Sequence, residues 1–252
     1  MYMNIVTKLQ KKFNHDRAKR LISNNERQFK ECVKYLFLPK KSDALLIVFS
    51  GFTGEVRRYN YVSSFCKMEI NQLYILDTWG YQGSYYWMDN GDIYPEKMVN
   101  ELIDTVIKNH AIKRIITCGS SKGGSAAIYF GLINNANYIF SGACQFLVGT
   151  YLGREEHIRI LAGMIGALDK EKMIETLDTK IAEIISKHKD STAINLFYST
   201  EELTYERQII PLKACLDAHG VTYNEKIELF KEHSEVGNVF PIYVCNELKK
   251  IL

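Results

Sequence analysis

One serine of this chain, Ser121, lies in a sequence pattern that is typical of a nucleophile. The pattern is G-x-S-x-G over residues 119–123, between the β-branched run 115–118 and the small helix-forming residues 125–127. Such a turn between a strand and a helix is sharp and strained, and it lifts the serine hydroxyl clear of the sheet. Its backbone N–H groups, beginning with that of Lys122, face the place where negative charge would develop. We therefore interpret Ser121 as a nucleophile and the Lys122 N–H as an oxyanion donor.

The same glycine- and serine-rich turn has two other interpretations. It could bind phosphate, but residues 119–124 have neither the spacing of a Walker loop nor the G-x-G-x-x-G fingerprint of a dinucleotide site. It could also be an accidental loop, but the strand signal before it and the alanine-rich helix signal after it are the context that a nucleophile turn requires. The sequence therefore favours nucleophilic chemistry at Ser121.

A serine hydroxyl is a weak nucleophile and needs a general base. His233 fits this role, because it follows the apolar run 227–230, which we expect to belong to the last strand. That position places His233 at the carboxyl ends of the strands, the edge that holds Ser121 and where open α/β sheets bind their ligands. The other histidines lie in the N-terminal segment, in expected helices or at helix ends; they are His15, His110, His157, His188 and His219.

The base in turn needs an acid that orients it, and in hydrolases with such a turn the chain order is serine, acid, histidine. The expected strand 193–198 is followed by the loop 199–204, in which Glu201 and Glu202 both qualify. We favour Glu202, because one or two turn residues should separate the strand end from a side chain that points back at the imidazole. Glu201 remains the alternative acid.

A second oxyanion donor is expected in the loop that follows the apolar run 44–49. That loop, 50–54, has the sequence SGFTG, in which Gly51 lets the backbone turn. The N–H of Phe52 or Thr53 is then the candidate donor, with Gly51 against the substrate. The alternative interpretation is an ordinary strand-to-helix turn, and the glycines on both sides of an aromatic residue favour the functional one.

The segment 77–89 is unusually aromatic, because it holds both tryptophans and three tyrosines. It follows the expected strand 73–76, so we expect it at the same edge as Ser121. Aromatic rings stack on sugar faces, while Asp77, Gln82 and the tyrosine hydroxyl groups are expected to bond to sugar hydroxyls. The predicted substrate contacts of this loop are Asp77, Trp79, Tyr85 and Tyr86. Alternatively, the tryptophans pack the loop against the sheet, and Asp77 is another acid or a turn residue.

Strand and helix signals alternate along most of the chain. Continuous apolar runs predict strands that are buried on both faces, as in a parallel sheet. These runs are 44–49, 73–76, 115–118, 138–141, 193–198 and 226–230. Amphipathic or capped segments predict helices over 95–109, 122–134, 204–219 and 237–252. We therefore predict an α/β fold with a mostly parallel central sheet and helices on both faces.

The length of 252 residues suits one α/β domain. We divide the chain into a leading segment, 1–40, and a main domain, 41–252. Within the leading segment, 24–34 has a helical signal and 32–38 a strand signal, and the sequence does not decide between them. The segment 153–189 interrupts the alternation with two or three helices, which form either a lid over the site or extra packing at the sheet edge.

Composition excludes several classes of protein. With 46% hydrophobic residues, 24% charged residues and a net charge of +3, the chain is ordinary for a globular protein and gives no sign of nucleic-acid binding. The six cysteines are dispersed without a C-x-x-C pair, which is typical of reduced thiols in a cytoplasmic protein. We expect no secretory signal, no transmembrane helix, no metal and no cofactor. The sequence does not indicate the oligomeric state.

Taken together, these residues resemble the α/β-hydrolase superfamily. The resemblance rests on the Gly119–Gly124 turn, the Ser50–Phe52 loop, the segment Asp77–Tyr86 and the late His233, and it covers roughly residues 44–252. More narrowly, the chain resembles bacterial capsular polysaccharide biosynthesis proteins of the XcbB/CpsF type. More distantly, it resembles the glycan O-acetyltransferases of accessory secretion systems. The resemblance implies an α/β-hydrolase-like sheet with a helical insertion.

The resemblance also implies a site in which Ser121 is the nucleophile, His233 the base and Glu202 the acid, where many α/β-hydrolases carry aspartate. Such a site acts on an acyl group, as an esterase or an O-acyltransferase, with a small acyl ester or a cell-surface glycan as substrate. The competing interpretation is a catalytically silent scaffold or binding component of polysaccharide biosynthesis. Retention of serine, histidine and a candidate acid argues against the scaffold, and the many charges of 153–189 argue against a lipase lid.

Overall fold

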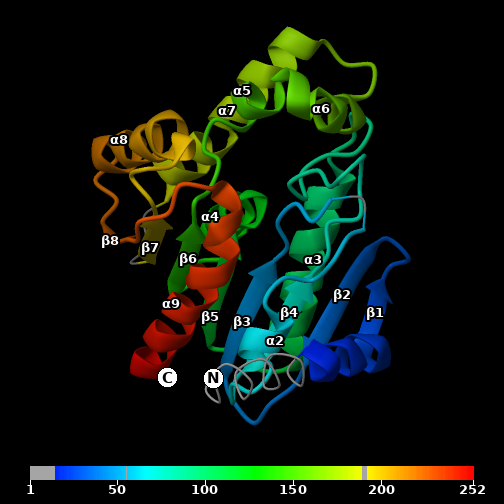
Figure 1. The fold of residues 1–252 in the computed structure, drawn as a ribbon. Helices are drawn as coiled ribbons and strands as arrows, with labels where there is room; N and C mark the ends of the chain where they lie inside the picture. Colours follow the sequence, from blue (N-terminus) through cyan, green and yellow to red (C-terminus); the bar gives the residue numbers. More distant parts are fainter. Residues whose placement is uncertain (1–14, 55, 189–191) are drawn as a thin grey trace, which may run out of the picture.

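The computed structural model of the protein describes residues 15–54, 56–188 and 192–252, and its centre is an eight-stranded sheet (Figure 1). The strand order across the sheet is β1-β2-β4-β3-β5-β6-β7-β8. The pairs β1–β2 and β2–β4 are antiparallel, and every other neighbouring pair is parallel. The strands are β1 (Glu26–Phe29), β2 (Val33–Leu38), β3 (Ala44–Phe49), β4 (Asn71–Ile75), β5 (Arg114–Ser120), β6 (Tyr138–Gly142), β7 (Ala193–Tyr198) and β8 (Tyr223–Ile227).

The central strand β3 shows why the sheet must be covered on both sides. All of its residues are apolar and buried. Successive side chains of a strand point to opposite faces, so Ile47 and Phe49 join one hydrophobic cluster while Leu46 and Val48 join the other. Two cores, one on each face, follow from this single apolar run.

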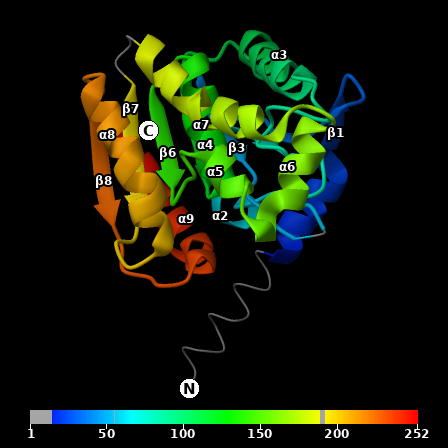
Figure 2. The same ribbon diagram turned by 90° about the horizontal axis from the view of Figure 1, so that it is seen from above.

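Helices cover the two faces of the sheet (Figures 1 and 2). Apolar side chains of α3, α4, α7 and α8 pack in one cluster, and those of α2, α9 and the helix over 15–25 pack in the other. The helices are α2 (Val62–Phe65), α3 (Tyr94–Asn109), α4 (Lys122–Ile133), α5 (Val148–Leu152), η1 (Glu155–His157), α6 (Ile158–Ile165), α7 (Lys170–Lys187), the π-helix η2 (Tyr205–Ile209), α8 (Ile210–Ala218), η3 (His233–Glu235) and α9 (Val236–Ile251).

The predicted α/β fold with a mostly parallel sheet is confirmed, and two details of the prediction need correction. The last strand was expected over 226–230, but β8 ends at Ile227. β8 is an edge strand whose residues are largely exposed. It therefore has no continuous apolar run from which its bounds could be predicted. The predicted helix 204–219 is divided into η2 and α8, and Pro211, which has no N–H to donate, lies in the first turn of α8.

Of the two alternatives in the leading segment, the strand holds, as β2 at Val33–Leu38. The helix expected over 24–34 is wrong, because the helix over 15–25 ends there and β1 and a turn follow before β2. The residues 1–14 of the predicted segment 1–40 lie outside the described part of the chain. β1 and β2 form a hairpin that extends the sheet beyond β4, so this segment continues the main sheet.

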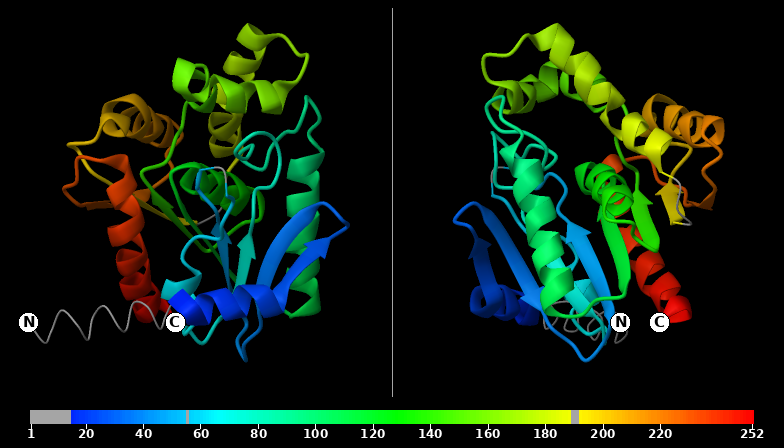
Figure 3. Two further views of the ribbon diagram at one scale, coloured as in Figure 1. Left: turned by 45° about the vertical axis from the view of Figure 1, so that its right-hand side comes forward. Right: turned by 180° about the vertical axis from the view of Figure 1, so that it is seen from behind.

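Between β6 and β7 the chain forms α5, η1, α6 and α7, and α5 and α6 lie beyond the carboxyl ends of the strands (Figures 1 and 3). This helical segment begins at Val148, five residues before the predicted start of the insertion. Two backbone hydrogen bonds tie α6 to the loop after β4: Asn90 N–H to Gly163 O at 2.9 Å and Gly91 N–H to Met164 O at 2.7 Å. Within the described residues, no helix combines the length and apolar character that crossing a membrane requires.

Candidate active site

Ser121 occupies the turn between β5 and α4, with φ 54° and ψ −129°. A positive φ is uncommon for a residue with a side chain, and such strain is typical of functional turns. Two glycines permit the turn: a Cβ on Gly119 would overlap the carbonyl of Gly123, and a Cβ on Gly123 would overlap the carbonyl of Phe49. The Ser121 N–H donates to Gly142 O at 2.7 Å, which ties the turn to β6. The backbone therefore fixes where the hydroxyl group lies.

Three of the predicted side chains meet at this turn. His233 Nε2 lies 2.8 Å from Ser121 Oγ, and His233 Nδ1 lies 2.5 Å from Glu202 Oε1. The Glu202 side chain is 4% exposed and that of His233 is 34% exposed. When Nδ1 carries the proton and donates it to the carboxylate, Nε2 is free to accept the hydroxyl proton of Ser121. This is the hydrogen-bond order that a serine nucleophile needs.

The two glutamates that were candidates for the acid differ in position. Glu202 follows β7 and points at His233, and its Oε2 atom is buried without a hydrogen-bond partner among the described residues. Glu201 is exposed, and its backbone N–H donates to Ser199 Oγ at 3.1 Å. The structure therefore brings Glu202, and not Glu201, to the imidazole.

The loops that carry Glu202 and His233 are joined by Ser199, which the sequence analysis did not single out. Its buried Oγ donates to Phe230 O at 2.6 Å and accepts the Phe230 N–H at 3.1 Å. Two residues after Phe230, the Glu232 N–H donates to Glu235 Oε2 at 3.0 Å, and this bond closes the turn that holds His233. A serine directly after a buried strand is the signal that would have found this connection.

Gln145 is a second residue that the sequence analysis did not name, and its side chain reaches Ser121. It follows β6, it is fully buried, and its Nε2 lies 3.3 Å from Ser121 Oγ. Tyr85 Oη donates to Gln145 Oε1 at 3.3 Å, so the amide presents its NH₂ group to the serine. Ser125 Oγ donates to the Gln145 carbonyl at 2.6 Å and accepts its N–H at 3.0 Å. Ser121 Oγ therefore accepts from Gln145 while it donates to His233.

Two of the predicted oxyanion donors, Lys122 and Phe52, lie close to Ser121. Lys122 begins α4, and the N–H groups in the first turn of a helix have no acceptor within the helix. On the opposite side, Gly51 and Phe52 both line the pocket in front of Ser121. The Gly51 N–H is already used, because it donates to Asn60 Oδ1 at 3.1 Å.

The backbone N–H of Thr53 is the other predicted donor in that loop. The Thr53 hydroxyl group bonds within the loop, where it donates to Val56 O at 3.0 Å and accepts the Arg58 N–H at 3.1 Å. Thr53 is not among the described residues that line the pocket, whereas Phe52 is. Of the two alternatives, Phe52 is thus the one near Ser121.

A pocket of about 510 Å³ opens in front of Ser121 and His233. The helical segment after β6 contributes part of its wall through Tyr151, His157 and Ile160, and the His157 ring stacks on Tyr151 with centroids 4.3 Å apart. Burial is the main cause that lowers the pKa of His157 below its usual value, so the imidazole is neutral at neutral pH. Among the described residues, no group of three or more His, Cys, Asp or Glu side chains could hold a metal ion.

The aromatic loop departs from the prediction. Tyr85, Tyr86, Trp79 and Asp77 are all buried, and within 77–89, which is described throughout, Gln82 alone lines the pocket. The rings of Trp79, Tyr85 and Tyr86 instead fill the space between the loop and the sheet, and Asp77 pairs with Lys122. Gln82, which the sequence analysis expected to bond to sugar hydroxyls, is the residue of this loop that lies at the pocket.

Asp77 pairs with the side chain of Lys122 beneath the site. Lys122 Nζ lies 2.6 Å from Asp77 Oδ2, and both side chains are 1% exposed. The ammonium group also lies over the rings of Phe52, at 5.3 Å, and Tyr86, at 4.9 Å. Burial lowers the pKa of Lys122, and the Asp77 carboxylate opposes that effect. Gly83 makes the pairing possible, because a Cβ there would lie 2.5 Å from Lys122 Nζ.

No protein-family model matches this sequence, and no curated protein matches it as a relative. Solved structures do match. One is a variant of the capsule O-acetyltransferase of Neisseria meningitidis serogroup A in complex with CoA, with a TM-score of 0.75 and 20% identity, covering 88% of this chain and 93% of that chain. Another is the glycosylation-associated Gap123 complex from Streptococcus agalactiae, with a TM-score of 0.72 and 18% identity, covering 89% of this chain and 46% of that chain.

A third similar structure is FphF, a fluorophosphonate-binding serine hydrolase of Staphylococcus aureus, with a TM-score of 0.61 and 12% identity, covering 84% of this chain and 90% of that chain. This chain has an α/β-hydrolase fold. In the α/β-hydrolase fold a sharp turn after a strand carries the nucleophile at the top of the sheet, and the turn between β5 and α4 holds Ser121 at that edge. The predicted resemblance to the superfamily is confirmed at the level of the fold.

Proposed function

We propose that this protein transfers an acyl group through an acyl-Ser121 intermediate, as an O-acyltransferase or esterase that acts on a glycan. The observation that carries the proposal is the hydrogen-bonded series from Glu202 through His233 to Ser121, with separations of 2.5 Å and 2.8 Å. A serine hydroxyl becomes a useful nucleophile when such a base removes its proton and an acid orients the base. The strained turn at Ser121 supports the same role.

In the first step, Ser121 Oγ attacks the acyl carbonyl carbon while His233 Nε2 takes the hydroxyl proton. The bond between that carbon and the leaving group then breaks, and His233 gives the proton to the leaving group. Glu202 remains ionised and stabilises the imidazolium. The N–H groups of Lys122 and Phe52 stabilise the negative charge on the carbonyl oxygen.

In the second step, a hydroxyl group attacks the acyl-Ser121 ester, and His233 takes the proton of that hydroxyl. A new ester bond forms, the bond to Ser121 breaks, and Oγ recovers its proton from His233. When the hydroxyl belongs to a sugar, the product is an O-acylated glycan. When it belongs to water, the product is a free acid, and the overall reaction is hydrolysis.

Gln145 positions the nucleophile in this scheme. Its Nε2 donates to Ser121 Oγ, and this bond leaves the Oγ proton directed at His233. The bond also restricts rotation of the hydroxyl group, so less freedom is lost when the reaction begins. Because Tyr85 holds the amide from behind, the buried aromatic loop supports catalysis without contacting the substrate.

Two features support a glycan acceptor and a thioester donor. The pocket wall carries hydroxyl and amide groups from Tyr151, Asn60 and Gln82, which suit a hydroxyl-rich ligand. The capsule O-acetyltransferase with a similar fold forms a complex with CoA. Residues of η1 and α6 add to the pocket wall, and exclusion of water by such a wall favours transfer to a sugar over hydrolysis.

The test is to incubate the purified protein with acetyl-CoA, with and without capsular oligosaccharide fragments, and to follow thiol release and oligosaccharide mass. We expect the acceptor to accelerate thiol release and to gain acetyl groups, and Ser121→Ala to abolish both. Equal release without an acceptor would identify the esterase form of the reaction. If no acyl ester or thioester acylates Ser121, the proposal fails and the silent scaffold is the better account.

A further inference from the structure

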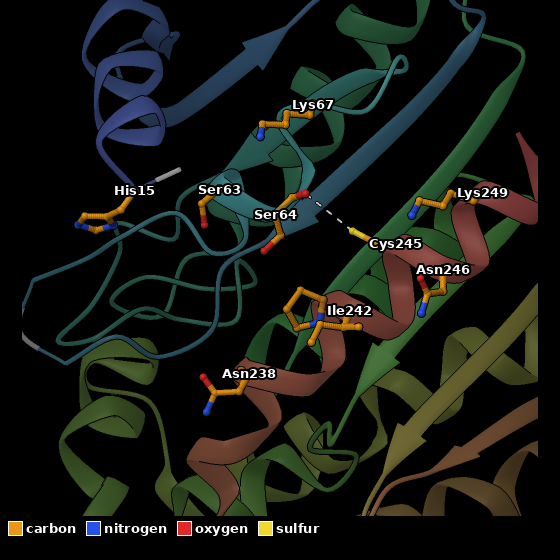
Figure 4. Close-up of a pocket in the computed structure, with 11 residues that line it drawn as sticks. His15, Ser63, Ser64, Lys67, Asn238, Ile242, Cys245, Asn246 and Lys249 are labelled. Atoms are coloured by element: carbon orange, nitrogen blue, oxygen red, sulfur yellow. Dashed lines mark hydrogen bonds between the residues drawn. The ribbon is translucent and has the colours of Figure 1, made fainter. Parts of the chain in front are cut away.

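A groove of about 1020 Å³ runs along α9 outside the catalytic pocket (Figure 4). One wall is formed by α2 and the turn after it, with Ser64 and Lys67, and the other by α9, with Asn246 and Lys249. The walls meet where Cys245 Sγ lies 3.8 Å from Ser64 O. Hydroxyl, amide and ammonium groups along both walls donate hydrogen bonds, so the groove suits an anionic ligand.

The charge of the groove is positive. None of the described residues that line it is acidic, and within the described chain neither Lys67 nor Lys249 forms a salt bridge. Two carboxylates near these lysines in the sequence, Glu69 and Glu247, pair with other lysines at 3.0 Å and 2.7 Å. Figure 4 shows Lys67 and Lys249 on opposite walls of the groove. Two uncompensated cations therefore face one space.

The groove and the catalytic pocket adjoin at Gly237. This residue lines both, and no atom lies within 4 Å of the place where its Cβ would be. Helix α9 rises by about 18 Å between Gly237 and Lys249, at about 1.5 Å per residue. A ligand that spans this distance from Ser121 must be long, with its acyl group at one end and its anionic groups at the other.

We propose that this groove binds an acyl-CoA donor, with its phosphates between Lys67 and Lys249 and its thioester at Ser121. The inference rests on the proposed function, in which a thioester acylates the serine. The C–S bond breaks as the Ser121 ester forms, and the CoA thiol leaves with the proton from His233. The apolar side chain of Ile242, which lines the groove and is 62% exposed, gives the uncharged arm of the donor a surface to contact.

Alkylation of Cys245 tests occupancy of the groove without relying on catalysis. Cys245 lines the groove, whereas Cys215, of the same exposure class, lies on α8 and serves as the internal control. The protein is treated with iodoacetamide, and peptide mass mapping measures the rate at each cysteine. CoA is added as its S-methyl thioether, because a free CoA thiol would itself consume iodoacetamide. We expect CoA at about ten times its Kd to slow alkylation of Cys245 about tenfold and to leave Cys215 unchanged. Equal Cys245 rates with and without saturating CoA overturn the proposal.

The phosphates in the groove could instead belong to an anionic glycan acceptor, so the same experiment is repeated with a sugar phosphate and with inorganic phosphate. We expect CoA to protect Cys245 at concentrations at which neither of these does. Protection by the sugar phosphate and not by CoA would assign the groove to the acceptor and overturn the assignment to the donor.

The double variant Lys67→Ala/Lys249→Ala tests the charge. We expect the KM for acetyl-CoA, divided by the KM for uncharged p-nitrophenyl acetate, to rise at least about tenfold, since charge-assisted contacts to phosphate are lost. Lys250→Ala, which removes a neighbouring lysine that pairs with Glu247, is the control and should leave this ratio unchanged. An unchanged ratio in the double variant contradicts binding of the acyl-CoA phosphates by Lys67 and Lys249. If fluorophosphonate does not label Ser121 in the wild-type protein, the proposed function is contradicted instead.

Discussion

His233 Nδ1 lies 2.5 Å from Glu202 Oε1, while the adjacent Glu201 faces solvent. These two glutamates therefore form a matched pair for mutation. Glu202→Gln places an NH₂ group or a neutral oxygen against Nδ1, which favours the wrong tautomer of the imidazole. We expect kcat for p-nitrophenyl acetate to fall by about 10³- to 10⁴-fold in Glu202→Gln. Glu201→Gln should keep wild-type kcat, and equal losses in both variants would rule out the assignment of Glu202.

Gln145 is expected to affect the rate of the chemical step rather than substrate binding. Gln145→Met keeps a side chain of similar length but removes the bond to Ser121 Oγ, so we expect kcat to fall about tenfold, the value of one ordinary hydrogen bond. Tyr85→Phe, which leaves the amide in place but removes its support, should have a smaller effect. Steady-state kinetics on p-nitrophenyl acetate measure both, and an unchanged kcat with a raised KM would contradict the positioning role.

The Asp77–Lys122 pair is expected to stabilise the loop beneath the site. Lys122→Met leaves the Asp77 carboxylate buried without its cation, so we expect the free energy of unfolding to fall by about 3–5 kcal/mol. Adding Asp77→Asn removes that charge and keeps an acceptor for the Ser84 N–H, which lies 2.7 Å from Asp77 Oδ2. Urea unfolding should show the double variant to be more stable than Lys122→Met. Additive losses would show that the two side chains act independently.

His157 gives the stability of the protein a dependence on pH. Burial lowers its pKa in the folded protein, so below a pH of about 6.5, the pKa of an unperturbed histidine, the unfolded chain binds more protons than the folded one. Its contribution to stability is therefore present above that pH and is lost as the pH falls towards the folded pKa. We expect His157→Asn, which cannot titrate, to lose less unfolding free energy than the wild type between pH 7.5 and 5. The urea midpoints of both proteins measure this, and parallel pH profiles would contradict it.

The sequence allowed the central sheet and the turn at Ser121 to be predicted because both depend on local patterns. A continuous apolar run such as that of β3 predicts a strand that is buried on both faces of the sheet. A serine between two glycines, with a strand before it and a helix after it, predicts a sharp turn like that at Ser121. The edge strand β8 could not be located in this way, since its largely exposed residues follow no apolar pattern.

The roles of the aromatic loop and of Gln145 depend on contacts between distant parts of the chain. The type of residue at Tyr85 does not reveal that its ring is buried or that its hydroxyl bonds to an amide sixty residues later. Likewise, nothing in the pattern around Asp77 shows that its partner is the lysine of the nucleophile turn. Both contacts are set by packing, which composition and spacing leave open.

The activation of Ser121 by His233 is the central claim, and intact-mass spectrometry after fluorophosphonate treatment tests it most directly. We expect one adduct on the wild-type protein, no adduct on Ser121→Ala, and much slower labelling of His233→Ala, because the hydroxyl then lacks the base that lies 2.8 Å away. Circular dichroism of each variant establishes that it is folded. A folded wild-type protein that gains no adduct, or an adduct that persists in Ser121→Ala, would contradict the account.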